Sequence, residues 1–114
     1  MITILHNPRC STSRKVLEMI RETGTEPEIV EYLKHPLGRK DLVSTLIALE
    51  MGPRDVMRTS EPLYSELGLA DPDMSDSALL DQLVAHPQLI ERPIVVTAKG
   101  ARLCRPAEKV LEIL

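Results

Sequence analysis

Two short apolar segments near the start of the chain are separated by the length of a single helix. Residues 2–5 form the first and end just before Pro8, and residues 28–33 form the second. Between them, residues 12–23 place apolar side chains at helical spacing and stop at Gly24. A strand, one short crossover helix and a second strand predict two parallel strands.

The rest of the chain separates into a helical middle and a β-rich end. Helices are predicted where apolar residues recur at helical spacing before Gly52, Gly68 and His86, with Ser75 or Asp76 opening the last of them. Residues 53–57 predict a short helical turn. The end carries a β-branched strand at 93–97, a turn at Lys99-Gly100, a strand at 101–104 and a final helix opened by Pro106.

This order predicts the fold class. A parallel βαβ half followed by a ββα half is the arrangement of thioredoxin, an α/β fold with a mixed sheet. Here a helical segment of roughly fifty residues is inserted between the two halves. A chain of 114 residues is the size of one domain, so we expect a single thioredoxin-like domain over residues 1–114.

Composition restricts both the core and the partners. The chain has no Trp and no Phe, so Leu, Ile, Val and Met are expected to build its core. A net charge of -3 argues against nucleic-acid binding, which needs a basic surface. No run approaches the roughly 20 apolar residues of a membrane span, and no signal peptide is visible. The two cysteines form no dense disulfide framework, which favours the cytoplasm. A monomer is expected.

Cys10 is the candidate nucleophile. It lies between the first predicted strand and the first helix, where unpaired N–H groups and the helix dipole favour a thiolate. Arg9, Arg14 and Lys15 add positive charge nearby, and such sites lower the pKa of a cysteine from about 8.5. The alternative is a small buried apolar cysteine, which polar neighbours disfavour.

The loop lacks the second thiol of a Cys-x-x-Cys pair, because Ser13 stands at that position. An intermediate on Cys10 must therefore be resolved by an outside thiol or by Cys104. We prefer a structural role for Cys104, as a small hydrophobe in an interior strand. A phosphatase-type loop is excluded, since its arginine would fall at Val16. The chain shows no metal-ligand cluster, so no metal is expected.

The sequence resembles the glutaredoxin-coupled arsenate reductase family over nearly its whole length. The matching segments are His6-Asn7-Pro8-Arg9-Cys10-Ser11-Thr12-Ser13-Arg14, Gly24-Thr25-Glu26-Pro27, Glu66-Leu67-Gly68-Leu69-Ala70, Arg92-Pro93-Ile94-Val95-Val96 and Arg102-Leu103-Cys104-Arg105-Pro106. Their combination and order are specific, whereas each alone is weak. The chain ends at Leu114, and Ser11 follows the cysteine where Gly is common; both features are similar to a shorter branch of the family.

The resemblance implies which residues act. Cys10 matches the nucleophile, and Arg58, Arg92 and Arg105 match arginines that bind the oxyanion by bidentate hydrogen bonds. Taken singly, each arginine is better explained as a solvated surface charge. His6 matches a residue that keeps the cysteine ionised, and a loop-bracing role for it is about equally expected. The loop residues Asn7, Ser11, Thr12, Ser13 and Arg14 are expected to support the site, together with Pro93, which is usually cis in this fold.

The resemblance also implies a reaction. The Cys10 thiolate attacks arsenate, glutathione reduces the arsenic to arsenite, and glutaredoxin clears the mixed disulfide. Glutathione is a co-substrate, and no tightly bound cofactor is required.

Two other functions stay open from the sequence. One is a regulator of the Spx type that binds RNA polymerase, although such proteins usually carry the Cys-x-x-Cys switch that Ser13 removes. The other is a glutathione-dependent thiol reductase acting on a different substrate, in which the arginines bind a glutathione carboxylate.

Overall fold

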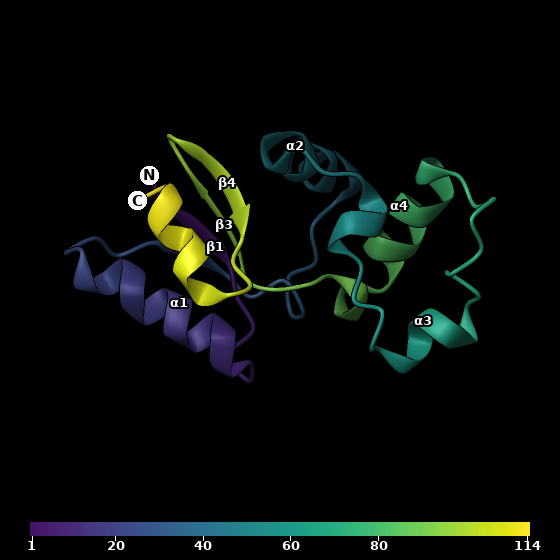
Figure 1. Ribbon diagram of the computed structural model, residues 1–114, viewed down its shortest axis with the longest axis horizontal. Helices are drawn as coiled ribbons and strands as arrows, with labels where there is room; N and C mark the ends of the chain where they lie inside the picture. Colours follow the sequence, from purple (N-terminus) through teal and green to yellow (C-terminus); the bar gives the residue numbers. More distant parts are fainter. The chain divides into compact units, whose positions relative to one another are not determined.

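The computed structural model describes residues 1–114, which form two compact units (Figure 1). The sheet unit consists of Met1–His35 and Arg92–Leu114, and the helical unit consists of Pro36–Glu91. The helical unit is thus inserted between two segments that share one sheet, as the sequence predicts. That both units act as one domain stays a prediction.

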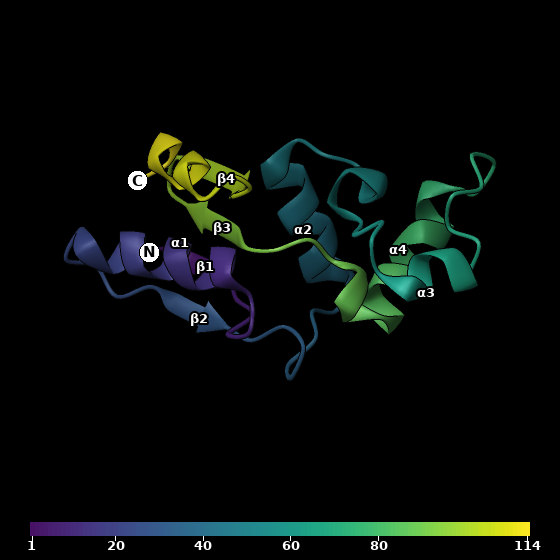
Figure 2. The ribbon, with the colours of Figure 1, turned by 60° about the horizontal axis from the view of Figure 1, so that its bottom comes forward.

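A four-stranded mixed sheet forms the centre of the sheet unit (Figure 2). The strands are β1 (Thr3–Leu5), β2 (Glu28–Val30), β3 (Ile94–Thr97) and β4 (Gly100–Leu103), in the order β2-β1-β3-β4. β1 is parallel to β2 and antiparallel to β3, and β3 is antiparallel to β4. The parallel pairing of the first two strands and the C-terminal hairpin are both confirmed.

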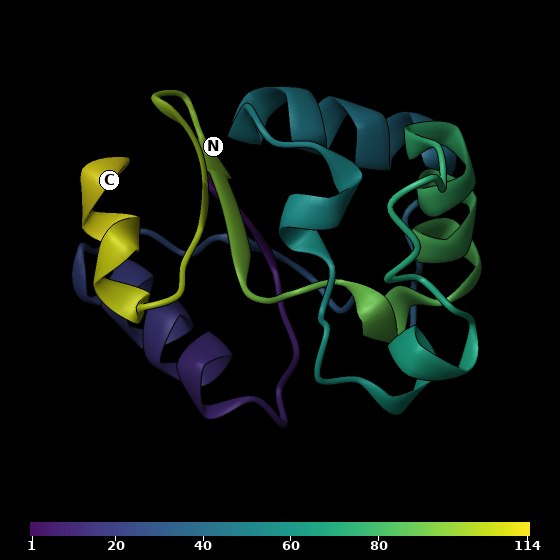
Figure 3. The same cartoon turned by 45° about the vertical axis from the view of Figure 1, so that its right-hand side comes forward.

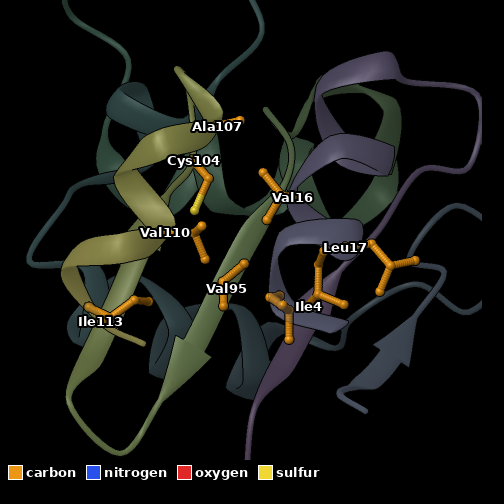
Figure 4. Close-up of a cluster of buried hydrophobic side chains, with 9 residues drawn as sticks. Ile4, Val16, Leu17, Val95, Cys104, Ala107, Val110 and Ile113 are labelled. Carbon is orange, nitrogen blue, oxygen red and sulfur yellow. The ribbon is translucent and has the colours of Figure 1, made fainter. Parts of the chain in front are cut away.

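Two helices contribute to the core over this sheet: α1 (Ser11–Glu22) and the 3₁₀ helix η3 (Ala107–Glu112). Side chains from both meet Ile4 of β1 and Val95 of β3 in one buried cluster (Figure 4). α1 begins and ends one residue before the predicted range 12–23, and Gly24 beyond its end adopts a φ of +86°, a conformation that a residue with a side chain rarely adopts.

Several predicted boundaries are displaced by one residue, and three elements differ in how they begin or end. The second strand ends at Val30, because the Glu31 carbonyl accepts the N–H groups of Lys34 and His35 in a turn. The hairpin pairs Thr97 with Gly100, so Gly100 already belongs to β4. The last helix is a 3₁₀ helix, and Pro106 precedes it in an extended conformation instead of opening it.

The helical unit contains α2 (Arg39–Leu49), η1 (Pro53–Val56), α3 (Pro62–Glu66), α4 (Asp76–Ala85) and η2 (Pro87–Leu89) (Figure 3). Ser75 is the N-cap of α4, and its side chain accepts the Ala78 N–H as the sequence suggests. An isolated antiparallel bridge joins Met57 to Ile90 at the end of this unit. None of the helices combines the length and hydropathy that a membrane span needs.

The core is aliphatic with one exception. Leu, Ile and Val dominate the buried side chains, but Tyr32 is only 1% exposed and is the largest of the fully buried residues. Met57 is buried as well. Branched aliphatic side chains, and one tyrosine in the sheet unit, therefore fill the core of a chain that has no Phe or Trp.

Cys104 lies just beyond β4, which is an edge strand and not the interior strand that we predicted. The side chain is nevertheless fully buried and points into the cluster formed with Val16, Val110 and Ile113 (Figure 4). Burial raises the pKa of the Cys104 thiol to about 12. A buried, protonated thiol is a poor nucleophile, which supports a structural role.

We expect Cys104→Ser to lower the free energy of unfolding by about 1–3 kcal/mol, because it places a hydroxyl in an apolar cluster. Urea unfolding at constant pH measures the effect, with Cys104→Ala as the matched variant that adds no polar group. A serine variant as stable as the parent would contradict this assignment. After mild peroxide, mass spectrometry should find Cys10 oxidised and no bridge between Cys10 and Cys104.

Candidate active site

The loop between β1 and α1 presents Cys10 at the N-cap position of the helix. Asn7 holds this loop, since its carbonyl accepts the Cys10 N–H at 3.0 Å and its side-chain oxygen accepts the Arg9 N–H at 3.0 Å. The Cys10 carbonyl accepts the Arg14 N–H at 3.0 Å and so begins the helix. Asn7 is buried, whereas Cys10 is partly exposed, so Cys10 remains accessible from solvent while its loop is anchored.

Ser13 connects the loop to the sheet. Its side chain is fully buried, and its oxygen lies 2.6 Å from Nδ1 of His6 and accepts the Asn7 N–H at 3.1 Å. Burial lowers the pKa of His6, which favours the neutral ring. In the neutral ring, Nδ1 either accepts the Ser13 hydroxyl or donates to its oxygen, according to which ring nitrogen carries the proton. This contact braces the loop; a role of His6 in ionising Cys10 stays a prediction.

Ser11 and Thr12 form the first turn of α1 and are not its N-cap, which is Cys10 itself. The importance of Ser13 as a bridge was not apparent from the sequence. The available signal was its position, three residues after Cys10, where redox loops carry a second cysteine.

Opposing effects act on the pKa of the Cys10 thiol. Burial alone would raise the pKa of this thiol, but the backbone N–H of Ser13 and the guanidinium groups of Arg92 and Arg105 favour the thiolate and lower the pKa overall. Nη1 of Arg105 lies 3.9 Å from the sulfur. The thiolate predicted from the sequence is therefore supported by the structure.

The source of positive charge differs from the sequence prediction. Lys15 pairs with Glu108 at 2.9 Å, and the guanidinium of Arg14 donates to the Pro8 carbonyl at 3.0 Å. Both side chains are thus engaged elsewhere, and Arg9 is exposed. The charges that act on Cys10 come instead from Arg92 and Arg105, which are distant from it in the chain.

Arg92 and Arg105 are joined to each other as well as to the sulfur. Nη1 of Arg105 donates to the Arg92 carbonyl at 3.0 Å. Nε of Arg92 is buried and has no hydrogen-bond partner. The Arg92–Pro93 peptide bond is cis as expected, and the Arg105–Pro106 bond is cis as well, which the sequence did not indicate. A buried donor without an acceptor is uncommon in a folded protein and suits an anionic ligand.

Arg58 belongs to the helical unit, where Nη1 of its guanidinium pairs with the Glu91 carboxylate at 2.8 Å. Both side chains are about one-quarter exposed, at 25% and 24%. The Arg58 N–H also donates to the Leu89 carbonyl at 2.7 Å, so this segment is well anchored. Sequence reasoning did not find Glu91, because an isolated carboxylate before Arg92 carries no motif.

In the sheet unit, Cys10 is a nucleophile with the guanidinium groups of Arg92 and Arg105 beside it. A thiolate can attack an electrophilic centre, and guanidinium groups can hold its oxygens and stabilise the negative charge that develops. No group of three or more His, Cys, Asp or Glu side chains is placed to bind a metal ion.

Titration of Cys10 tests this arrangement. We expect the pH midpoint of its alkylation to fall below the value of about 8.5 for free cysteine, and to rise in Arg92→Ala and Arg105→Ala because each removes a cation beside the sulfur. Iodoacetamide rates followed by mass spectrometry measure the midpoint. Lys15→Ala is the matched control, and a similar shift there would contradict the assignment of charge.

The low pKa of His6 predicts a dependence of stability on pH. Below its ordinary value of 6.5, the unfolded chain binds a proton at His6 that the folded protein does not bind, so stability falls as the pH decreases through this range. His6→Gln should make this slope shallower, by at most about 1.4 kcal/mol per pH unit. Urea unfolding between about pH 7.5 and 5.5 measures it. An equal change in His35→Gln, at an exposed position, would refute the explanation.

The chain matches the ArsC family over residues 5–113. The arsenate reductase of Escherichia coli strain K12 is 52% identical over 113 residues, which cover 99% of this chain and 80% of that protein. The arsenate reductase of Rhizobium meliloti strain 1021 is 50% identical over 99% of this chain and 81% of its own length.

The solved structures agree with the family match. The arsenate reductase from Vibrio cholerae superimposes with a TM-score of 0.95 at 43% identity, covering 99% of this chain and 97% of that one. The thioredoxin-like fold predicted from the sequence is thereby confirmed. On sequence and fold together, this chain belongs to the ArsC family.

Proposed function

We propose that this protein is an arsenate reductase that uses Cys10 as its nucleophile and glutathione and glutaredoxin as reductants. The observation that carries the proposal is the Cys10 sulfur with its lowered pKa beside Arg92 and Arg105. Relatives named arsenate reductase share about 50% sequence identity with this chain over nearly its whole length, which supports arsenate as the substrate of this protein too.

Arsenate is a tetrahedral oxyanion, and the proposed ligands for its oxygens are Arg92, Arg105 and Arg58. The unpartnered Nε of Arg92 supports a role for that residue. Arg105 is close enough to the sulfur to hold an oxygen of the attacked group. Arg58 already donates to Glu91, but a guanidinium has five N–H groups, so further donors are left for an anion.

The proposed reaction has three steps. The Cys10 thiolate forms a bond to arsenic, and one oxygen takes up a proton and leaves as water. A glutathione thiolate then attacks the Cys10 sulfur; an S–S bond forms, the S–As bond breaks, and its electron pair stays on arsenic, which becomes arsenite. A glutaredoxin thiolate finally attacks the glutathione sulfur and releases Cys10 as a thiolate.

The role of each supporting residue follows from the loop. Asn7 and Ser13 hold the peptide that carries Cys10, and His6 fixes Ser13. We propose that Ser11, Thr12, Arg14 and the cis Pro93 complete this frame. The chemistry requires reduced glutathione and a glutaredoxin, so the proposal includes a cytoplasmic location, where thiols are kept reduced.

The experiment that tests this function is an arsenate reduction assay with glutathione, with and without glutaredoxin. We expect Cys10→Ser to abolish turnover, since an alcohol at this position is not ionised near neutral pH. Arg92→Ala should weaken arsenate binding by a few kcal/mol at most, seen as a raised KM. Arg39→Ala, an exposed arginine in the helical unit, is the control for loss of a positive charge.

The result that would overturn the proposal is arsenate turnover that survives Cys10→Ser. A wild-type protein that leaves arsenate unchanged yet reduces a glutathionylated protein would be a thiol reductase instead. Recovery of RNA polymerase from a pull-down, without any reductase activity, would indicate a regulator.

A further inference from the structure

A hollow of about 240 Å³ lies beside the loop that carries Cys10. Because β1 and β2 are parallel and in register, the segments that follow them leave the sheet at the same edge. The His6 N–H continues the pairing by donating to the Val30 carbonyl at 2.9 Å. The walls of the hollow come from these two segments, residues 6–9 and residues 31–34.

The walls combine a few apolar side chains with a particular set of charges. Pro8 and Leu33 are apolar and exposed, and Leu33 keeps 43% of its surface accessible. Arg9, Glu31 and Lys34 supply two positive charges and one negative charge. His6 also lines the hollow and favours its neutral form, so the net charge of the walls is positive.

Glu31 and Lys34 form a loose ion pair, with Nζ of Lys34 3.7 Å from a carboxylate oxygen of Glu31. A neighbouring carboxylate and ammonium complement the ammonium and carboxylate of a free amino-acid head group. Arg9 lies on the other wall and is joined by one peptide bond to Cys10. The hollow thus offers a paired carboxylate and ammonium on one wall and, on the other wall, a cation in the residue that precedes the nucleophile.

We propose that this hollow binds glutathione, with Glu31 and Lys34 holding the γ-glutamyl head group and Arg9 holding the glycine carboxylate. The inference rests on the proposed function, which supplies glutathione as the reductant. Glutathione carries two carboxylates and one ammonium, so its net charge of -1 is opposite to that of the walls. Its central cysteine then lies between the two groups that are held, beside the loop that carries Cys10.

Arg9 directly precedes Cys10 in the sequence, so a ligand that contacts Arg9 lies beside the loop that carries the nucleophile. Glutathione, as a tripeptide, spans about 10 Å when extended. The apolar side chains of Pro8 and Leu33 are available to pack against its uncharged middle.

This assignment gives arsenate and glutathione different binding residues. The arginines proposed for arsenate, Arg92 and Arg105, do not line the hollow. Glutathione held in the hollow therefore needs neither of them, and it can bind while the oxyanion stays bound. This differs from the alternative in which the arginine cluster itself binds a glutathione carboxylate.

The test measures binding without any arsenate, so that its outcome is independent of the proposed reaction. S-methylglutathione, which has no free thiol, is titrated into the ¹⁵N-labelled protein and followed by NMR. We expect shifts in residues 6–9 and 31–34, and a Kd that rises about threefold to fivefold in each of Arg9→Gln, Glu31→Gln and Lys34→Gln, as for exposed ion pairs. Lys40→Gln, on α2, is the matched control and should keep the parent Kd.

A second ligand identifies which carboxylate each cation binds. The S-methylglutathione monoester, blocked at glycine, should bind the parent more weakly than the free acid, and Arg9→Gln should remove this difference while Lys34→Gln preserves it. Shifts confined to the neighbourhood of Arg92 and Arg105, or a Kd that none of the three substitutions changes, would overturn the proposal. Binding as expected in a protein that leaves arsenate unchanged would keep the glutathione site and remove only the arsenate reductase function.

Discussion

The register of β1 between two neighbours of opposite direction is the constraint on which the active site depends. Leu5 is paired with Val30 of β2 and with Ile94 of β3, and Ile94 is paired with Leu103 of β4. Since β3 runs against the other three strands, its start lies at the same edge as their ends. The cysteine loop, the segment 31–34, the Arg92-Pro93 step and Arg105 therefore all leave the sheet at one edge.

At this edge, the chemistry depends on a balance between desolvation and hydrogen bonding. A sulfur withdrawn from water would by itself hold its proton more tightly, and that effect is the largest single influence on Cys10. Donors from three separate segments, at Ser13, Arg92 and Arg105, outweigh it. Their positions follow from strand pairing and from the turn of α1. A thiolate here is thus a property of the folded sheet and not of the short cysteine motif alone.

Local patterns sufficed to predict most of the fold. The strands, α1 and α4 follow from apolar periodicity, a cap at Ser75 and a stop at Gly24. Errors occurred where tertiary contacts overrode local preference. The second strand is shortened because a turn uses the Glu31 carbonyl, and the buried Cys104 lies beyond an edge strand. Burial there is determined by packing against α1 and η3, which no single segment reveals.

The site was only partly predictable, for a related reason. Cys10 can be found from its position between a strand and a helix, and the three arginines came from the resemblance to a family. The ion pair of Arg58 with Glu91 and the contact of His6 with Ser13 depend on side chains that meet only after folding. The charges credited to Arg14 and Lys15 were misplaced because those side chains have other partners.

The buried serine at position 13 affects where the reducing equivalents of the proposed reaction come from. The Ser13 hydroxyl holds the loop through its contact with His6, but a serine cannot form a disulfide with Cys10. The remaining thiol, Cys104, is buried in the core. Under the proposed reaction each turnover must borrow its reducing equivalents from the cell's soluble thiol supply. The rate of that reaction would then fall whenever glutathione becomes oxidised, which couples the enzyme to the redox state of its surroundings.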